Sequence, residues 1–298
     1  MINMKKVIVI CGPTAVGKTK LSVEVAKKLN GEIINADSTQ VFKMMDIGTA
    51  KVTEEEKENI PHHLFDIRKP TEDYTVYDYQ RDCRYWIEDI LSRGKTPILV
   101  GGTGLYIKAA LYDYEFEEEN TSYSFQNKTN EELYEELKQI DFNAEIHPNN
   151  RKRVERALNY YYQHGVPISS QKKASKLLYD TIFIGLTTDR EVLYERINKR
   201  VYKMLEDGLV KEAEKLYQLG YRTKAIMTPI CYKELFAYFD KEKSLEESIE
   251  LIQQRSRKYA KRQYTWFNHQ LPVEWVEVDF NCFENTIQEV ENKIKKSF

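Results

Sequence analysis

The chain opens with short apolar runs that alternate with amphipathic stretches. Strands are predicted over residues 7–10, 32–36 and 96–100, where β-branched and other apolar side chains follow one another. A helix is predicted after the first strand, and another over residues 77–91, where apolar side chains recur at helical spacing. Because strands that alternate with helices build parallel sheets with both faces covered, we expect an α/β fold.

The pattern changes after Leu111. Residues 112–130 are acidic, rich in tyrosine and poor in aliphatic side chains, and the chain then reads as helices up to Gly165 with a break near 143–150. The remaining predicted elements are a strand over 181–186, helices over 190–219 and 245–266, and a strand over 273–278. We therefore predict a core domain made of residues 1–113 and 179–298, interrupted by a helical insertion domain at 114–178.

Composition allows a sizeable core and excludes few functions. Hydrophobic residues make up 41% of the 298 residues and charged residues 31%, with a formal net charge of −2. A nucleic-acid partner would therefore have to be bound by local basic patches. The four cysteines show no metal-ligand spacing and are expected to be reduced thiols. The apolar run near the N-terminus is too short for a signal peptide or a membrane span, so we expect a cytoplasmic protein that binds no membrane.

A phosphate-binding motif joins the first strand to the first helix. The segment fits G-x-x-x-x-G-K-[ST], and its residues are Gly12, Pro13, Thr14, Ala15, Val16, Gly17, Lys18 and Thr19. The glycines let backbone N–H groups converge on phosphate oxygens at a helix N-terminus. Lys18 would bridge phosphate oxygens and the Thr19 hydroxyl would ligate Mg²⁺. The fold prediction thus becomes a parallel sheet like that of P-loop NTPases, flanked by helices.

The motif indicates a polyphosphate without saying which one. An ordinary P-loop NTPase has a carboxylate at the end of a nearby strand to hold Mg²⁺, but here the strand over 96–100 runs into Gly101 and Gly102. A carboxylate follows the second strand instead, as Asp37. Ligands of parallel sheets bind at the carboxyl ends of the strands, so Asp37, Thr103 and the P-loop are expected to share one crevice. The alternative is that Asp37, together with Ser38, is only a helix N-cap.

Several further segments make the chain similar to one family, the tRNA dimethylallyltransferases. The resemblance rests on GPTAVGKT, DSTQVF, MDIGTAK, PHHLFDI, LVGGTGLY, IHPNN and KRQYTWF, which follow one another in the family's order over nearly the whole chain. It implies that the P-loop holds the diphosphate of dimethylallyl diphosphate, and that the acceptor is the N6 amine of the adenosine next to the anticodon of tRNA. Asp37 would be the general base, Thr103 would contact the leaving diphosphate, and Arg200 would bind it.

The resemblance also implies contacts to tRNA. The residues expected to bind it are Asp37, Ser38, Thr39, Gln40, Lys152, Arg153, Arg156, Lys233, Lys261, Arg262, Gln263 and Trp266. Two segments are locally basic: 151–173, which includes Lys172 and Lys173, and 255–267, where aromatic rings alternate with the charges. Cations for phosphates and planar rings for stacking suit the single-stranded loop of an anticodon stem-loop. A helix with a solvated basic face and a buried aromatic face would explain the second segment equally well.

Other functions remain open at this point. An ATP-dependent small-molecule kinase shares the P-loop, a non-catalytic nucleotide-binding RNA adaptor would use the basic segments, and an adenylate prenyltransferase would use AMP or ATP as acceptor. Arg196, four residues before Arg200, either presents a second cation to phosphate or pairs with Glu191 or Glu195. His62 and His63 are expected to be structural or loop residues, and the protein is expected to be a monomer.

Two positions depart from the family pattern. Cys231 stands where the family usually has glycine, and Asn268 stands where it usually has arginine. The first raises the question of a close backbone approach, and the second removes one contact to phosphate. Neither lies in the predicted diphosphate site, so activity is still expected, with a lower affinity for RNA.

Overall fold

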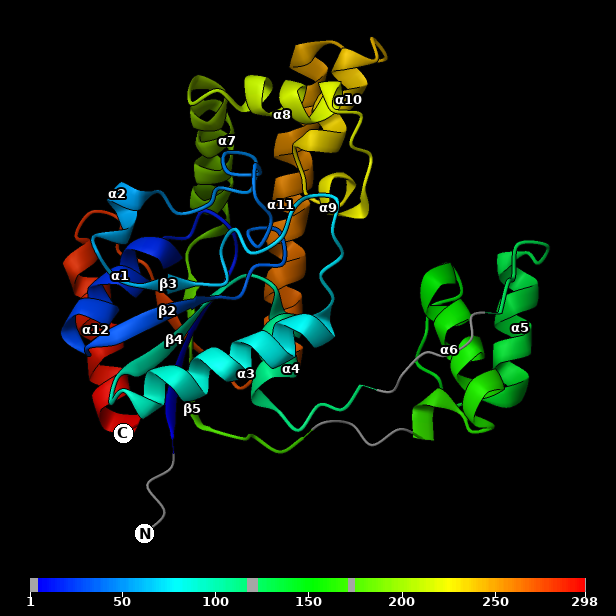
Figure 1. Cartoon of the computed structure of the whole chain (residues 1–298), viewed down its shortest axis with the longest axis horizontal. Helices are drawn as coiled ribbons and strands as arrows, with labels where there is room; N and C mark the ends of the chain where they lie inside the picture. Colours follow the sequence, from blue (N-terminus) through cyan, green and yellow to red (C-terminus); the bar gives the residue numbers. More distant parts are fainter. Residues whose placement is uncertain (1–4, 117–122, 171–174, 298) are drawn as a thin grey trace. The chain divides into compact units, whose positions relative to one another are not determined.

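The chain forms two compact units in the computed structural model (Figure 1). The structure describes residues 5–116, 123–170 and 175–297. The first unit is Met1–Tyr112 with Leu177–Phe298, and the second is Asp113–Lys176. The division falls close to the predicted limits of the insertion at 114–178, and Tyr112 and Leu177 form an isolated antiparallel bridge where the chain leaves and re-enters the first unit.

A six-stranded sheet with the order β3-β2-β4-β1-β5-β6 lies at the centre of the first unit, and every strand pair is parallel. Its strands are β1 (Lys6–Cys11), β2 (Gly31–Asn35), β3 (His62–His63), β4 (Thr96–Gly101), β5 (Asp180–Thr187) and β6 (Glu274–Glu277). The parallel α/β prediction is therefore confirmed. The sequence missed β3, because two histidines in a row carry no apolar strand signal.

Alternate strand residues divide between two cores. Ile8, Ile10 and Ile33 pack with α1 (Lys18–Lys28) and α12 (Phe283–Ser297) in one hydrophobic cluster. On the other side of the sheet, α3 (Val76–Ser92) contacts β2 and β4 and packs on α4 (Gly104–Leu111) (Figure 1). The near-continuous burial of the strands is what a sheet covered on both faces requires.

The other helices of the first unit are α2 (Glu54–Lys57), α7 (Arg190–Glu206), α8 (Leu209–Gln218), α9 (Lys224–Met227), α10 (Tyr232–Phe239) and α11 (Leu245–Gln270). Helices α7 to α11 pack on one another as a helical layer, whereas α2 contacts α1. The sequence predicted helical structure over 190–219, which is confirmed, but it did not locate the break between α7 and α8. Gly208 has a φ of 102° and ends the helical path between α7 and α8.

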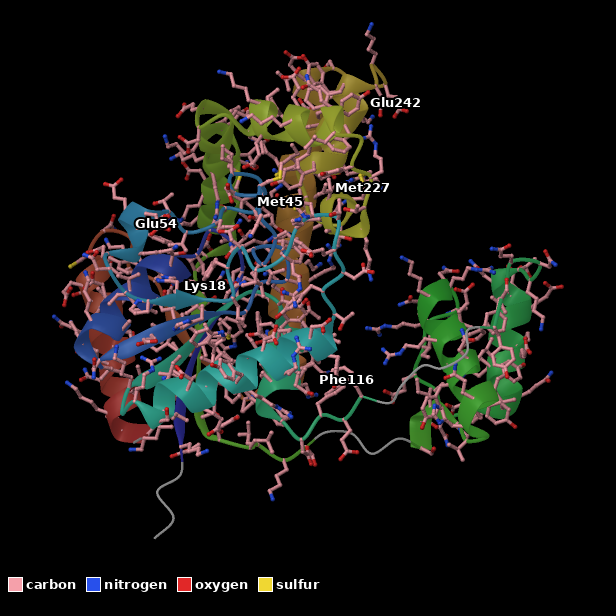
Figure 2. The ribbon with its side chains drawn as sticks, in the orientation of Figure 1. Lys18, Met45, Glu54, Phe116, Met227 and Glu242 are labelled. Atoms are coloured by element: carbon pink, nitrogen blue, oxygen red, sulfur yellow. The ribbon has the colours of Figure 1, made fainter. Side chains whose placement is uncertain are left out.

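This helical layer also holds the loop that follows β2. Val41, Phe42 and Met45 are buried in a second hydrophobic cluster with Leu209 of α8 and Leu235 of α10. Figure 2 labels Met45 among the side chains of these helices. The position of the loop at 37–51 therefore depends on helices that are more than a hundred residues away in the sequence.

The second unit is a small helical body with its own core. Its helices are α5 (Asn130–Ile140) and α6 (Arg151–His164), followed by a 3₁₀ turn at Ile168–Ser170. Leu133, Leu137, Val154 and Leu158 are buried between the two helices. Lys152, Arg153 and Arg156 are exposed on α6, whereas Lys172 and Lys173 lie outside the described residues.

Candidate active site

The P-loop has the backbone geometry of a phosphate cradle. Gly12, Ala15 and Gly17 have φ values of 134°, 65° and 102°, and α1 begins directly after Gly17. A Cβ on Gly12 would lie 2.7 Å from the backbone oxygen of Leu186 on β5. Only glycine fits that close approach, so the first motif glycine is required both by its φ and by its neighbour.

The Lys18 side chain lies over this cradle. Its Nζ donates hydrogen bonds to the backbone oxygens of Gly12 (3.0 Å) and Pro13 (2.6 Å). Burial, helped by the nearby Arg200 guanidinium and opposed by Asp37, lowers the pKa of Lys18 to about 8. Burial makes the charged form of Lys18 less favourable, and a bound polyanion would stabilise it. The cradle is therefore a site for negative charge.

Two arginines of α7 donate hydrogen bonds to the P-loop. Arg196 Nε donates to the backbone oxygen of Ala15 (3.0 Å), with its guanidinium stacked 3.8 Å from the ring centre of Phe280. Arg200 Nη1 donates to the hydroxyl of Thr14 (3.1 Å). Burial lowers the pKa of both arginines. The alternative that Arg196 pairs with Glu191 or Glu195 on a solvated face is wrong, because its guanidinium contacts the P-loop and the Phe280 ring instead.

Asp37 caps a turn and not a helix. Its Oδ1 accepts from the backbone N–H of Thr39 (2.9 Å) and from the Thr39 hydroxyl (2.7 Å), and residues 38–40 form bends and a turn. The N-cap alternative is therefore wrong. Within the described part of the chain, the other carboxylate oxygen, Oδ2, accepts no hydrogen bond. One oxygen fixes the side chain and the second is available to a ligand.

Thr103 joins the end of β4 to the same turn. Its hydroxyl accepts from the backbone N–H of Ser38 (3.0 Å) and lies 3.3 Å from the Ser38 hydroxyl. Gly101, the last residue of β4, must be glycine because a Cβ there would lie 2.2 Å from the backbone of Ala36. The segment after β4 thus lies directly against the segment after β2, as adjacent parallel strands dictate.

Gln263 has a structural role that the sequence did not reveal. Its side-chain oxygen accepts from the Thr14 N–H (3.1 Å) and its Nε2 donates to the Gly102 oxygen (3.1 Å). Only 5% of its surface is exposed, and its side chain lines the cavity that the P-loop borders. Gln263 thus ties the P-loop to the end of β4, and its expected contact with tRNA stays a prediction.

These parts surround one cavity of about 820 Å³. Asp37, Thr103, Arg200 and the P-loop residues from Thr14 to Thr19 all line it, and so do Ser38, Thr39 and Gln40. The predicted crevice at the carboxyl ends of β1, β2 and β4 is thus present. Tyr259 of α11 also lines the cavity, and burial raises its pKa. The sequence placed Tyr259 only among aromatic rings for RNA.

The basic aromatic segment of α11 divides between core and surface. Phe267 is fully buried and Tyr264 packs against the main core, so these two rings serve the fold. Trp266 is half-buried, and a Cβ on Gly104 would lie 2.0 Å from its ring. Lys261 and Arg262 are exposed. The expectation of alternating stacking rings is therefore wrong for Phe267, and three cations of the segment are exposed at the surface, because Lys258 is exposed as well.

The two departures from the family pattern have visible consequences. Cys231 is buried with a φ of 109° and a ψ of −60°, a backbone conformation that favours glycine. Lys233, two residues later, is exposed on α10. Asn268 Oδ1 accepts from the indole N–H of Trp275 (2.8 Å), so its side chain is used within the protein.

The cavity offers an oxygen ligand for a hard cation such as Mg²⁺ in the Thr19 hydroxyl. Among residues 5–116, 123–170 and 175–297, no group of three or more His, Cys, Asp and Glu side chains could hold a metal ion. Mg²⁺ typically needs only one or two protein ligands when substrate phosphates supply the rest, so Thr19 on the cavity wall fits this use. In the same part of the chain, no helix is long and apolar enough to cross a membrane.

Comparisons with known proteins agree along the whole chain. The family model described as IPP transferase matches residues 40–270, and one described as isopentenyl transferase matches residues 5–73. The chain is 50% identical to the tRNA dimethylallyltransferase of Anoxybacillus flavithermus, covering 99% of this chain and 97% of that protein. It is 49% identical to the enzyme of the same name from Macrococcus caseolyticus, covering 99% and 98%.

Solved structures give the same result. The tRNA isopentenylpyrophosphate transferase of Bacillus halodurans superposes with a TM-score of 0.77 at 42% identity, covering 98% of this chain and 96% of that one. A eukaryotic dimethylallyltransferase acting on tRNA superposes with a TM-score of 0.85 at 32% identity, covering 99% of this chain and 79% of that one. Both matches extend over at least 98% of this chain.

Proposed function

This chain belongs to the IPP transferase family, and on that premise we propose that it transfers a dimethylallyl group from dimethylallyl diphosphate to tRNA. The acceptor is the exocyclic N6 amine of the adenosine next to the anticodon. The observation that carries the proposal is the single cavity shared by Asp37 and the P-loop. A carboxylate and a phosphate cradle on one cavity can hold the two reacting ends of a prenyl transfer at once.

Asp37 is the general base of the proposed reaction. The N6 lone pair of adenine is delocalised into the ring and is a poor nucleophile, so removal of a proton as the N–C bond forms lowers the barrier. The hydrogen bonds from Thr39 hold Oδ1 and leave Oδ2 for that proton. A base positioned in this way typically contributes about 10²–10⁴-fold in rate.

The leaving diphosphate gains negative charge as the allylic C–O bond breaks. Lys18, Arg200 and the backbone N–H groups of the P-loop are fixed around the cradle before the reaction, and such preorganised groups give large electrostatic stabilisation. Thr103 would contact the same leaving group from the end of β4. Mg²⁺, held through the Thr19 hydroxyl, would neutralise phosphate charge when bound.

The tRNA is proposed to approach through its anticodon stem-loop. An adenosine in that loop leaves its stack at small cost, which lets the base enter the cavity beside Asp37, Ser38, Thr39 and Gln40. Exposed cations suit the phosphates: Lys261 and Arg262 on α11, and Lys233 on α10. Trp266 would lie beside the bound loop.

Within the second unit, the exposed face of α6 provides Lys152, Arg153 and Arg156 for the stem. Phosphate contacts of this kind position the nucleic acid without reading its sequence. We further propose that the protein acts as a cytoplasmic monomer.

A small-molecule kinase is a poorer fit to this site. The strand next to the P-loop strand, β4, runs into Gly101 and Gly102, so the Mg²⁺-holding carboxylate expected of a P-loop NTPase has no place there. The carboxylate follows β2, from where it faces the acceptor side of the cavity. A prenyltransferase that modifies free AMP would share the cradle and Asp37, and only the choice of acceptor separates it from the proposal.

The test is a transfer assay with a choice of acceptor. The protein is incubated with labelled dimethylallyl diphosphate, Mg²⁺ and either an anticodon stem-loop RNA or AMP. The proposal predicts label in the RNA and a steep fall in RNA binding with rising salt. Label in AMP alone would identify an adenylate prenyltransferase. In a parallel reaction that contains ATP, ATP turnover without prenyl transfer would favour the kinase.

A further inference from the structure

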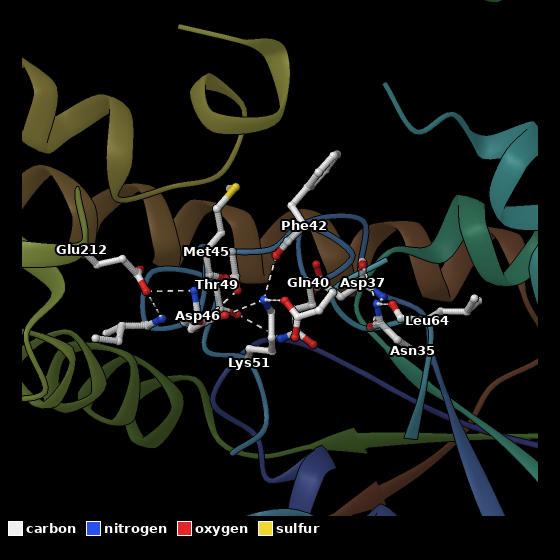
Figure 3. A network of polar contacts seen from close by, with 12 residues as sticks. Asn35, Asp37, Gln40, Phe42, Met45, Asp46, Thr49, Lys51, Leu64 and Glu212 are labelled. Atoms are coloured by element: carbon white, nitrogen blue, oxygen red, sulfur yellow. Dashed lines mark hydrogen bonds and ion pairs between the residues drawn. The ribbon is translucent and has the colours of Figure 1, made fainter. Parts of the chain in front are cut away.

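One carboxylate of the helical layer holds the loop that borders the cavity (Figure 3). Glu212 of α8 accepts four hydrogen bonds, two on each oxygen. Oε2 accepts from the N–H groups of Asp46 and Ile47 (both 2.9 Å), and Oε1 accepts from the N–H of Gly48 (2.9 Å) and the Tyr232 hydroxyl (2.9 Å). Three successive N–H groups that converge on one anion form a nest. Glu212 is therefore the anion that shapes residues 46–48.

The packing around Gly48 makes this arrangement tight. A Cβ on Gly48 would lie 2.6 Å from the ring of Tyr232, whose side chain is fully buried. On the other side of the loop, Lys51 donates to the Phe42 oxygen (2.7 Å) and to the carboxylates of Asp46 and Asp66 (both 2.6 Å). The loop is thus fixed from both sides, and displacement of its 46–48 segment moves the carbonyl groups that follow.

Those carbonyl groups orient the side chain of Gln40. The Nε2 of Gln40 donates to the backbone oxygens of Thr49 (3.0 Å) and Ala50 (3.1 Å) (Figure 3). Two acceptors on one side fix which end of the amide is nitrogen, and they leave Oε1 as the group available to a ligand. Gln40, Thr49 and Ala50 all line the cavity that holds Asp37.

We propose that Glu212 is a positioning residue for recognition of the acceptor adenosine, acting through the loop at 46–50 and the Gln40 amide. This inference rests on the proposed transfer to RNA. Glu212 does not line the cavity; it keeps the Gln40 oxygen turned to where the exocyclic amine of the adenine would lie. The P-loop is held by separate contacts to Gln263 and Arg200.

Because the two substrates depend on different parts of the site, a Glu212→Gln variant separates them. The neutral amide has one acceptor oxygen and turns an NH₂ group toward N–H donors, so the nest opens. The loss of hydrogen bonds to a charged group predicts a rise in KM for the anticodon stem-loop of about tenfold, with KM for dimethylallyl diphosphate within about twofold. Glu214→Gln, on the exposed face of the same helix, is the control and is expected to match wild type.

A milder variant guards against a loss of folding. Tyr232→Phe removes one of the four donors and keeps the ring against Gly48, and it is expected to raise KM for the RNA by about threefold. Circular dichroism of each variant reports the fold directly. A purely structural role would reduce the amount of active enzyme and leave both KM values unchanged, which would overturn the inference.

A double-mutant cycle tests the route through Gln40. In a Gln40→Ala background, Glu212→Gln is expected to change KM for the RNA by less than about twofold, since the group it positions is gone. Full additivity of the two changes, or an equal rise in KM for both substrates, would contradict the inference. If wild type transfers no prenyl group to RNA, the proposed function fails first; if wild type is active and Glu212→Gln behaves like Glu214→Gln, only this inference fails.

Discussion

Cys231 offers a quantitative test of how the structure stores backbone strain. At φ 109° and ψ −60° it occupies a region that L-residues rarely adopt, which costs of order 1–3 kcal/mol. Cys231→Ala keeps this strain, whereas Cys231→Gly relieves it and adds about 0.4–1 kcal/mol of unfolded-state entropy. Both variants lose the buried sulfur, so that loss cancels between them. The glycine variant is therefore expected to be more stable than the alanine variant by about 0–2.6 kcal/mol, with a central value of about 1.3 kcal/mol.

Urea unfolding followed by tryptophan fluorescence measures this difference. All three tryptophans, Trp86, Trp266 and Trp275, belong to the first unit, so the signal reports on the unit that contains Cys231. At an exposed site within α11, Lys258→Ala is expected to be more stable than Lys258→Gly by about 1 kcal/mol, the usual order. The reasoning is refuted if Cys231→Ala is more stable than Cys231→Gly, as alanine is expected to be at Lys258.

Three further predictions concern the phosphate cradle. Burial and Arg200 bring the pKa of Lys18 to about 8, so raising the pH from 7 to 9 removes most of its charge. The ratio of the diphosphate affinities of wild type and Lys18→Ala, measured by calorimetry, should then fall about tenfold; a constant ratio would contradict this. Gln263→Leu leaves the Thr14 N–H and Gly102 oxygen unpaired and should cost about 2–4 kcal/mol in urea unfolding, whereas Gln254→Leu on the exposed side of α11 should be nearly neutral. Arg200→Lys, which cannot reproduce the planar fork, should weaken diphosphate binding by about tenfold or more, and unchanged binding would remove Arg200 from the site.

The sheet and the cradle were predictable because their signals are local. Residues 7–19 carry a buried strand, a glycine turn and a helix start in one continuous segment, and the carboxyl-end rule for parallel sheets then places Asp37 beside it. The break at Gly208 was missed because apolar residues continue at helical spacing on both sides of it. The strand β3 was missed because its residues, His62 and His63, are polar, and His63 bonds to the buried Glu32 (2.8 Å).

Long-range contacts account for what the sequence could not give. The amide of Gln263 reaches the P-loop across 249 positions, and the carboxylate of Glu212 reaches Ile47 across 165, so neither role has a local pattern. Phe267 lies one position from the half-buried Trp266, and composition alone does not tell a core ring from a surface ring. Pairings of this kind are set by the fold and become visible only with it.

The central claim is that Asp37 takes the proton of the adenine amine beside the diphosphate cradle. The most direct measurement is single-turnover prenyl transfer by Asp37→Asn, which keeps the shape of the side chain and an acceptor for the Thr39 hydrogen bonds. The account predicts a fall in rate of about 10²–10⁴-fold, with diphosphate and stem-loop binding within about threefold of wild type. A rate close to wild type, with both substrates bound, would contradict it.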